Sequence, residues 1–333
     1  MDGNVIRFPD LAFTRLLSHI SPTIRLAGFS LVVISTSITR PLTKNCLNGI
    51  KQNLFQLFAE TDAHIRGEVL GLLPHLLDRI RAATASLSKI LLKETNGNPS
   101  ASYSNRNIVT ATLDAHKGFL HWLLQFLSAG LRPGAVYQRH ISCLKTLTIL
   151  SQSRIDLSIS HKHRSKQVAL EINWPFQLRL FTPWVQQSLL HLLMDPFEDV
   201  RSLAAALLEI SNFTVKVPET KGRMDAQSAT STDYTLIDFV EFTKQAEELM
   251  MLSGRADHAD GVSLAYALLF SKVDATSHSL RDIAQAQVTP FGTKLGIFNH
   301  LVSSLERTIR IGENDLSAAV QSFPLHGTLA SLR

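Results

Sequence analysis

The sequence is poor in cysteine and has no long hydrophobic run. Its two cysteines, Cys46 and Cys143, are too few for a disulfide framework or a cysteine-rich zinc site, so we expect a reducing compartment. Apolar runs such as 31–34 fall far short of the roughly 20 residues that cross a bilayer. The first ten residues lack the basic and apolar regions of a signal peptide. We therefore expect a soluble, cytoplasmic protein without membrane insertion.

Motifs of enzymes are also missing. The sequence contains no GxGxxG or GxxxxGK[ST] loop, no GxSxG elbow and no HExxH helix. We therefore expect a protein that is not an enzyme and binds no cofactor itself. His161 and His163 could face a metal ion, but Lys162, Arg164 and Lys166 would repel it. This segment is better interpreted as a basic loop, either in contact with phosphate or simply solvated.

Charge is scarce and unevenly distributed. Only 18% of the 333 residues are charged and 45% are hydrophobic, which is enough to bury a sizeable core. Residues 1–166 hold 20 Lys and Arg against 9 Asp and Glu, a net charge of +11, whereas residues 167–333 have a net charge of −6. This asymmetry indicates either a polyanionic partner on the first half or a solvated basic face.

What the sequence does contain is helical periodicity. Between residues 62 and 80 the apolar side chains fall three or four residues apart and form one stripe, and residues 196–210 repeat it. No segment alternates with a period of two for long enough to indicate a sheet. The sequence predicts an all-α protein. Further helices are expected over 107–129, 134–152, 181–194, 235–252, 258–272 and 290–309.

Three of the helices begin alike. The segments 21–28, 62–69 and 195–204 each combine a Ser or Asp able to cap the helix, an apolar residue before an arginine, and an apolar stripe. In two of them proline is expected at the first helical position. The segment from Gln138 repeats the arginine and the stripe. This pattern is typical of the second helix of HEAT repeats and predicts a HEAT/armadillo-like α-solenoid. The three arginines are expected to bridge to acids of neighbouring repeats: Arg25, Arg66 and Arg201.

The same patterns divide the chain into three segments. Residues 1–153 are expected to form basic N-terminal repeats, residues 154–180 a basic loop and connector, and residues 181–333 further repeats. Polar loops are expected over 95–105, 152–167 and 218–233. Three tryptophans could stack on nucleobases. Trp122 lies in an apolar helix and favours a core role, while the roles of Trp174 and Trp184 are open.

Four stretches resemble the thyroid adenoma-associated (THADA) family, in the same order. They are Leu131-Arg-Pro-Gly-Ala-Val-Tyr-Gln-Arg-His-Ile-Ser-Cys-Leu-Lys145, Asp195-Pro-Phe-Glu-Asp-Val-Arg-Ser-Leu-Ala204, Ser253-Gly-Arg-Ala-Asp-His-Ala-Asp-Gly261 and Pro324-Leu-His-Gly-Thr-Leu-Ala-Ser-Leu-Arg333.

The resemblance implies long, all-helical, HEAT-like proteins. Fungal members are non-catalytic partners of an FtsJ-like ribose 2′-O-methyltransferase, which they direct to nucleotide 32 in the tRNA anticodon loop. The methyl donor, S-adenosylmethionine, belongs to that enzyme. Animal members have been tied to calcium-pump regulation, which implies an alternative function as a protein–protein adaptor without RNA contact.

Two features depart from the family. Its members are several times longer, and residues 327–333 are typical of a helix that has only begun, so we expect a fragment. The Arg-Arg-Ser-Ala-Gly element linked to methylation is absent from the sequence.

Under the scaffold hypothesis the basic half would hold tRNA phosphates. The candidate contacts are Arg132, Arg139, Lys145, Lys162, Arg164 and Lys166. Arg139 and Lys145 are six residues apart and do not share one helical face cleanly.

Overall fold

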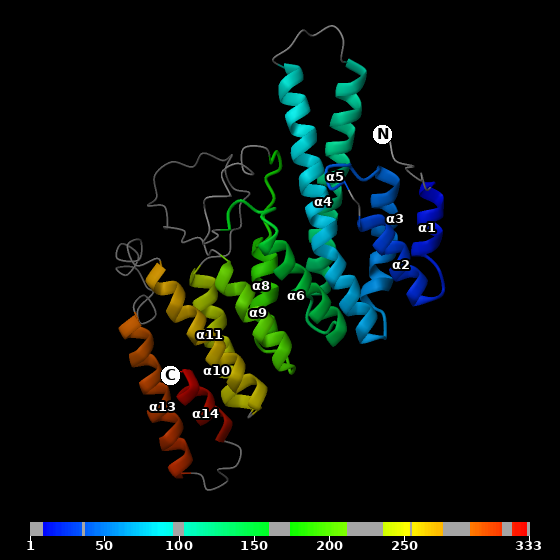
Figure 1. Cartoon of the computed structure of the whole chain (residues 1–333). Helices are drawn as coiled ribbons and strands as arrows, with labels where there is room; N and C mark the ends of the chain where they lie inside the picture. Colours follow the sequence, from blue (N-terminus) through cyan, green and yellow to red (C-terminus); the bar gives the residue numbers. More distant parts are fainter. Residues whose placement is uncertain are drawn as a thin grey trace, which may run out of the picture. The chain divides into compact units, whose positions relative to one another are not determined.

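The computed structural model describes only helices and the turns between them (Figure 1). It describes residues 9–34, 37–95, 103–159, 174–211, 236–253, 255–275, 294–314 and 322–331, and no strand occurs among them. The all-α prediction is confirmed. The helices are α1 (Asp10–Leu17), α2 (Pro22–Val33), α3 (Lys44–Phe58), α4 (Ala63–Thr95), α5 (Tyr103–Gly130), α6 (Tyr137–Gln152), α8 (Pro183–Leu192), α9 (Glu198–Ile210), α10 (Leu236–Ser253), α11 (Ala256–Ala275), α13 (Lys294–Asn314) and α14 (Ser322–Ser331).

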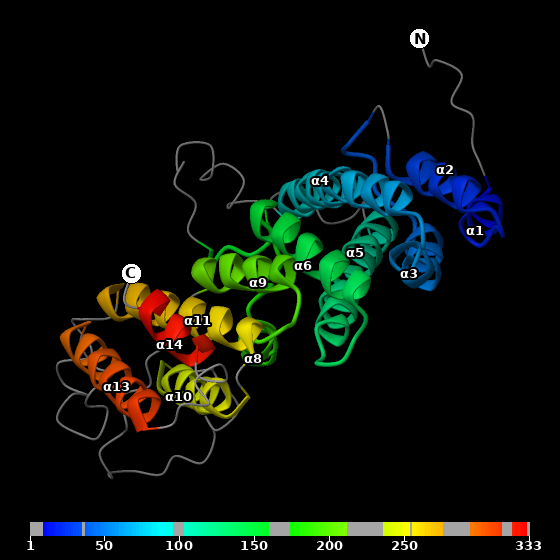
Figure 2. The same ribbon diagram turned by 90° about the horizontal axis from the view of Figure 1, so that it is seen from below.

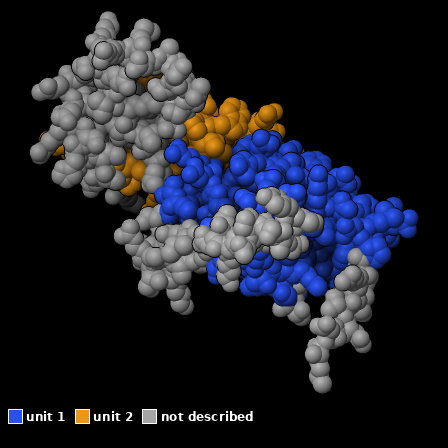
Figure 3. Space-filling model, turned by 90° about the horizontal axis from the view of Figure 1, so that it is seen from above, with its two compact units in different colours: residues 1–130, 138–180 blue, residues 131–137, 181–333 orange. Residues whose placement is uncertain are grey.

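The chain forms two compact units (Figure 3). Unit 1 comprises residues 1–130 and 138–180, and unit 2 comprises residues 131–137 and 181–333. The turn between α5 and α6 thus belongs to unit 2, although the helices on either side belong to unit 1. The three-segment division expected from the sequence stays a prediction.

In unit 1 the helices pack as successive pairs. Helices α1, α3 and α5 contact one another in series, and α2 packs on α4 (Figure 2). The core between these helices consists of large apolar side chains that are at most 1% exposed, among them Leu17, Phe29, Ile50, Leu76 and Phe119. Helices α4 and α5 lie side by side as a long hairpin (Figure 1). Pairs stacked in this way are the arrangement of a helical solenoid.

Unit 2 repeats the pairing. Helix α8 packs on α9, α10 on α11 and α13 on α14, and α9, α11 and α14 contact one another in series. Its core includes Leu189, Val200, Phe239, Ala265 and Ile297. None of the helices described in either unit has the length and apolar character needed to span a membrane.

Helix starts show why these segments fold locally. The hydroxyl oxygens of Thr43 and Thr182 accept hydrogen bonds from the backbone N–H groups of Cys46 (3.1 Å) and Val185 (3.4 Å), which caps α3 and α8. The carboxylate of Asp62 likewise accepts from the N–H of His64 at 2.8 Å.

Two expected caps differ from the prediction. The side chain of Ser21 makes no capping hydrogen bond, although Pro22 is the first residue of α2 as expected. Helix α9 begins only at Glu198, so Pro196 lies in the turn and not at the first helical position. The carboxylate of Asp195 accepts from the N–H of Phe197 at 2.9 Å and so stabilises the turn before the helix.

Some boundaries also differ. The helix expected over 62–80 continues to Thr95, and α5 begins at Tyr103, inside the expected 95–105 loop. The last helix begins at Ser322 instead of Gly327. Helices α1 and α3 were not among the expected helices. Most of the loops expected over 152–167 and 218–233 lies outside the described residues.

Candidate nucleic-acid interface

An arginine occupies the fourth position of α2, α4 and α9. In each case a guanidinium nitrogen donates to the backbone carbonyls six and five residues earlier. Arg25 donates to His19 (2.7 Å) and Ile20 (2.8 Å). Arg66 donates to Glu60 and to Thr61 (2.8 Å), and Arg201 to Asp195 (2.9 Å) and Pro196 (3.1 Å). Each arginine therefore holds the turn that precedes its own helix.

Two of these arginines also reach an acid on another element. Arg25 pairs with Glu60, which follows α3, and Arg201 pairs with Asp260 of α11 at 2.9 Å. For Arg25 and Arg201 the predicted structural bridge is confirmed. Their side chains are only 12% and 6% exposed, so neither guanidinium is presented to a phosphate.

Helix α6 departs from this pattern. Its fourth residue is His140, which is 2% exposed, and Arg139 is one position earlier. The guanidinium carbon of Arg139 instead lies 5.4 Å from the ring centre of Phe55 on α3, a cation–π contact. Phe55 is 52% exposed. Arg139 therefore does not hold the turn before its helix but takes part in a partly exposed cation–aromatic pair.

A second such pair lies one turn earlier on α3 and involves α5 in place of α6. The ammonium of Lys51 on α3 lies 5.8 Å from the ring centre of Trp122 on α5, and it donates to the carbonyl of Gly118 at 3.5 Å. Lys44, Lys51 and Phe55 are seven and four residues apart, so they follow one face of α3. We call Lys44, Lys51, Phe55, Trp122 and Arg139 the lysine–aromatic face.

The groove between α3 and α5 runs along this face. Its volume is about 410 Å³, and its polar lining includes Lys44, Asn48, Lys51 and one acid, Asp114. Ammonium and guanidinium groups contact phosphate oxygens, and the faces of aromatic rings stack on bases. The arrangement suits a single-stranded or looped nucleic acid.

Trp122 is held in place by other rings. It stacks on Phe126 with ring centres 5.3 Å apart, and its centre lies 5.7 Å from that of Phe119. Phe126 in turn meets Phe58 of α3 edge-on at 5.6 Å. The core role expected for Trp122 is only part of its role, because its ring is half-buried and carries Lys51. Trp174 is buried against Phe176, and Trp184 is 52% exposed.

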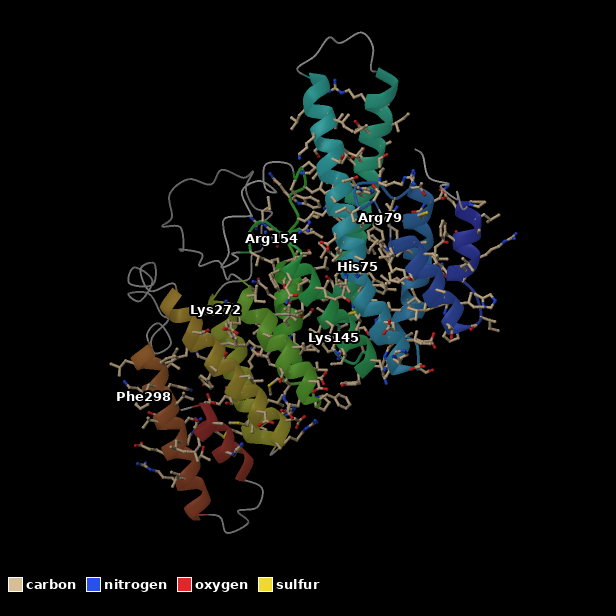
Figure 4. All side chains as sticks on the ribbon, viewed as in Figure 1. His75, Arg79, Lys145, Arg154, Lys272 and Phe298 are labelled. Carbon is tan, nitrogen blue, oxygen red and sulfur yellow. The ribbon has the colours of Figure 1, made fainter. Side chains whose placement is uncertain are left out.

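Three of the six predicted phosphate contacts lie among the residues that the structure describes, and it does not place them on one surface. Arg132 is exposed in the turn after α5, which belongs to unit 2. Lys145 is exposed on α6 (Figure 4), but six residues separate it from Arg139, a rotation of about 240° around the helix. Lys162, Arg164 and Lys166 lie outside the described residues, as do His161 and His163. Phosphate contact by these six residues stays a prediction.

Lys44 and Lys51 were not predicted from the sequence. Both are on α3, a helix that was not expected. Its buried positions have the spacing of a helix and could have revealed it: Cys46, Leu47, Ile50, Leu54, Leu57 and Phe58. In the part of the chain that the structure describes, no cluster of three or more His, Cys, Asp or Glu side chains could hold a metal ion.

Comparison with known proteins supports the resemblance seen in the sequence. The sequence model of a family described as "Trm732, TPR repeats" matches residues 6–202. A relative from Schizosaccharomyces pombe, the tRNA (32-2′-O)-methyltransferase regulator trm732, is 22% identical over 212 residues. The match covers 62% of this chain and 13% of the relative, so the chain spans a small part of the relative's length.

Proposed function

Because the chain belongs to the Trm732 TPR-repeat family, we propose that it is part of a non-catalytic scaffold for ribose 2′-O-methylation of tRNA at nucleotide 32. The observation that carries the proposal is the similarity to a protein named as a regulator of the tRNA (32-2′-O)-methyltransferase. In this proposal an FtsJ-like partner enzyme binds S-adenosylmethionine and transfers the methyl group. The assembly acts in the cytoplasm.

The contribution of the scaffold is orientation. Methyl transfer requires the 2′-oxygen of one ribose to meet the methyl donor in line, and holding the anticodon loop in that position lowers the entropic part of the barrier. The lysine–aromatic face supports this role, since its cations can hold phosphates and are themselves positioned by the rings of Phe55 and Trp122.

The turn-holding arginines support the same role. A scaffold positions its ligand only if the helices that carry the contacts are fixed relative to their neighbours. Arg25 and Arg66 fix the turns before α2 and α4, the helices that pack behind α3 within unit 1.

The test is a gene deletion in the organism of origin. We expect tRNA from the deleted strain to lose 2′-O-methylation at nucleotide 32, measured by mass spectrometry of the anticodon-loop fragment, while methylation elsewhere in the tRNA persists. Restoring the full-length gene should restore the modification. Unchanged methylation at nucleotide 32 would overturn the proposal.

A pull-down of the full-length gene product identifies the molecules that bind it. Recovery of tRNA together with an FtsJ-like methyltransferase is expected. Recovery of a membrane calcium pump without tRNA would instead favour an adaptor that does not contact RNA.

A further inference from the structure

Two of the stretches that carry the family resemblance meet in unit 2. The ring of Tyr137, where the turn after α5 ends and α6 begins, lies 4.6 Å from the ring of Phe197, in the turn between α8 and α9. The hydroxyl of Tyr137 donates to the carboxylate of Asp199 at 3.0 Å. These contacts tie the two turns together.

A third of these stretches, at the start of α11, packs against the α8–α9 turn. Arg201 pairs with Asp260 of α11, and Gly261 of α11 lies against the backbone of Leu193. A Cβ atom at position 261 would stand only 2.3 Å from the carbonyl oxygen of Leu193. The inward side of the turn is therefore occupied by structural contacts, and its outward side is presented to solvent.

The outward side carries apolar groups among acids. Val136 is 67% exposed and Phe197 is 49% exposed, and Glu198 and Asp199 beside them are exposed. We call Val136, Tyr137, Phe197, Glu198 and Asp199 the Phe197 patch.

A role in stabilising the fold explains only some of the residues of the Phe197 patch. The two acids stabilise the positive end of the α9 dipole. Phe197 is the N-cap residue of α9, where Ser, Thr, Asp or Asn would supply a hydrogen bond and Phe197 supplies none. A half-exposed phenyl ring at this position adds nothing to the cap, whereas it is suited to a contact with another molecule.

We propose that the Phe197 patch is the docking site for a basic protein surface, and that this surface belongs to the partner methyltransferase. The identity of the partner rests on the function proposed above. The faces of Phe197 and Tyr137 can receive a guanidinium, and the carboxylates of Glu198 and Asp199 can pair with it. Aromatic residues that become buried on binding are the usual anchors of a protein interface.

Charge favours a protein over an RNA at this site. The carboxylates of Glu198 and Asp199 repel phosphates, and residues 167–333 have a net charge of −6, whereas residues 1–166 have a net charge of +11. The two surfaces thus differ in chemistry: the lysine–aromatic face of unit 1 suits RNA, and the Phe197 patch of unit 2 suits a cationic protein.

The test uses the full-length gene product, purified from its own cells with the double substitution Phe197→Ala/Glu198→Lys. Asp199 is left intact because it holds Tyr137. We expect recovery of the methyltransferase to fall at least about tenfold, the effect of losing one interface anchor. Affinity for tRNA should stay at the wild-type value. The thermal unfolding midpoint should fall by only a few degrees, because the variant loses the ring contact with Tyr137 and one favourable charge at the start of α9.

Two control variants carry the same kinds of change elsewhere in unit 2. Trp184→Ala removes a ring of similar exposure (52%) at the opposite end of α8. Glu241→Lys reverses an exposed charge on α10, a helix that contributes no residue to the Phe197 patch. Both should recover the methyltransferase normally.

The outcomes separate the two proposals. Normal recovery of the enzyme by both the wild type and the double variant would overturn the docking site and leave the scaffold function standing. If the double variant lost tRNA affinity but kept the enzyme, the patch would be an RNA contact and the docking proposal would be wrong. Failure of the wild type itself to recover any methyltransferase would remove the proposed function, and the docking site with it.

Discussion

Arg201 is the side chain that joins the α8–α9 turn to α11. It is 5% exposed and donates to two turn carbonyls and to Asp260. Replacing it by methionine keeps the length of the side chain but leaves these acceptors without their donor. We expect Arg201→Met to lower the free energy of unfolding by about 2–4 kcal/mol, measured by urea denaturation followed by circular dichroism.

Arg255 provides the matched control for this substitution. It pairs with Asp257 at 2.5 Å, but its side chain is 54% exposed, so water screens the pair. Arg255→Met should leave the urea midpoint almost unchanged. An equal fall in the urea midpoint of both variants would show that burial does not increase the contribution of Arg201 to stability.

Gly261 allows a second prediction at the residue scale. Gly261→Ala would force α11 away from the carbonyl of Leu193, at a cost of about 1–3 kcal/mol. Gly71 on α4 has no neighbouring atom within 4 Å of an added Cβ, so Gly71→Ala should stabilise the protein by up to about 1 kcal/mol through helix propensity. Thermal melts of the two variants should therefore shift in opposite directions.

At the scale of helices, a buried carboxylate ties α10 to α11 and α13. Glu247 on α10 accepts hydrogen bonds from the hydroxyls of Tyr266 (2.7 Å) and Ser304 and is bonded to Nε2 of His300 (2.8 Å), with Arg307 3.8 Å away. Burial alone would raise the pKa of Glu247, but these donors and the charge of His300 lower it from 4.5 to about 2. The carboxylate is therefore ionised in the folded protein at neutral pH.

This network predicts a loss of stability in acid. Because the pKa is lower in the folded state, the stabilisation is fully present above pH 4.5 and is lost as the pH falls towards about 2. The full loss of unfolding free energy is about 3 kcal/mol. We expect urea midpoints of the wild type to fall more steeply between pH 5 and pH 3 than those of Glu247→Gln. Parallel curves would contradict the assignment.

Helices were predictable from the sequence where apolar stripes are strong. The stripe from Ile65 to Ile80 on α4 indicated a helix, and all of its apolar residues except Leu72 are buried in the structure. Helix α3 has the same stripe, but it also contains three asparagines and Gly49, which have weak helix propensity. Packing against α1 and α5 stabilises α3, and such contacts between distant segments cannot be seen in a local pattern.

For the molecule as a whole, the sequence indicated which half is basic but not which cations share a surface. Arg139 was found as a candidate because it lies in a recognisable segment. Its partner Phe55 and the neighbouring Lys51 lie more than 80 residues earlier. Only the packing of α3 against α5 brings Lys51 to Trp122. The position of Arg25, Arg66 and Arg201 near a helix start was predictable because the pattern is local and repeats. Their hydrogen bonds to the carbonyls of the preceding turn were not predicted.

The lysine–aromatic face gives the prediction that tests RNA binding directly. Substituting Lys44, Lys51 and Arg139 together by glutamine in the full-length gene product removes three cations from this face. If each neutralises one phosphate, the slope of log Kd for tRNA against log salt concentration should decrease by about 2 to 3, measured between 50 and 200 mM salt. Lys89→Gln, an exposed change on α4, should leave the slope unchanged, and Lys145→Gln tests the other face of α6. A triple variant with the wild-type slope would show that the phosphates lie elsewhere. A reduced slope in the triple variant, with the wild-type slope in Lys145→Gln, would place the phosphates on the lysine–aromatic face.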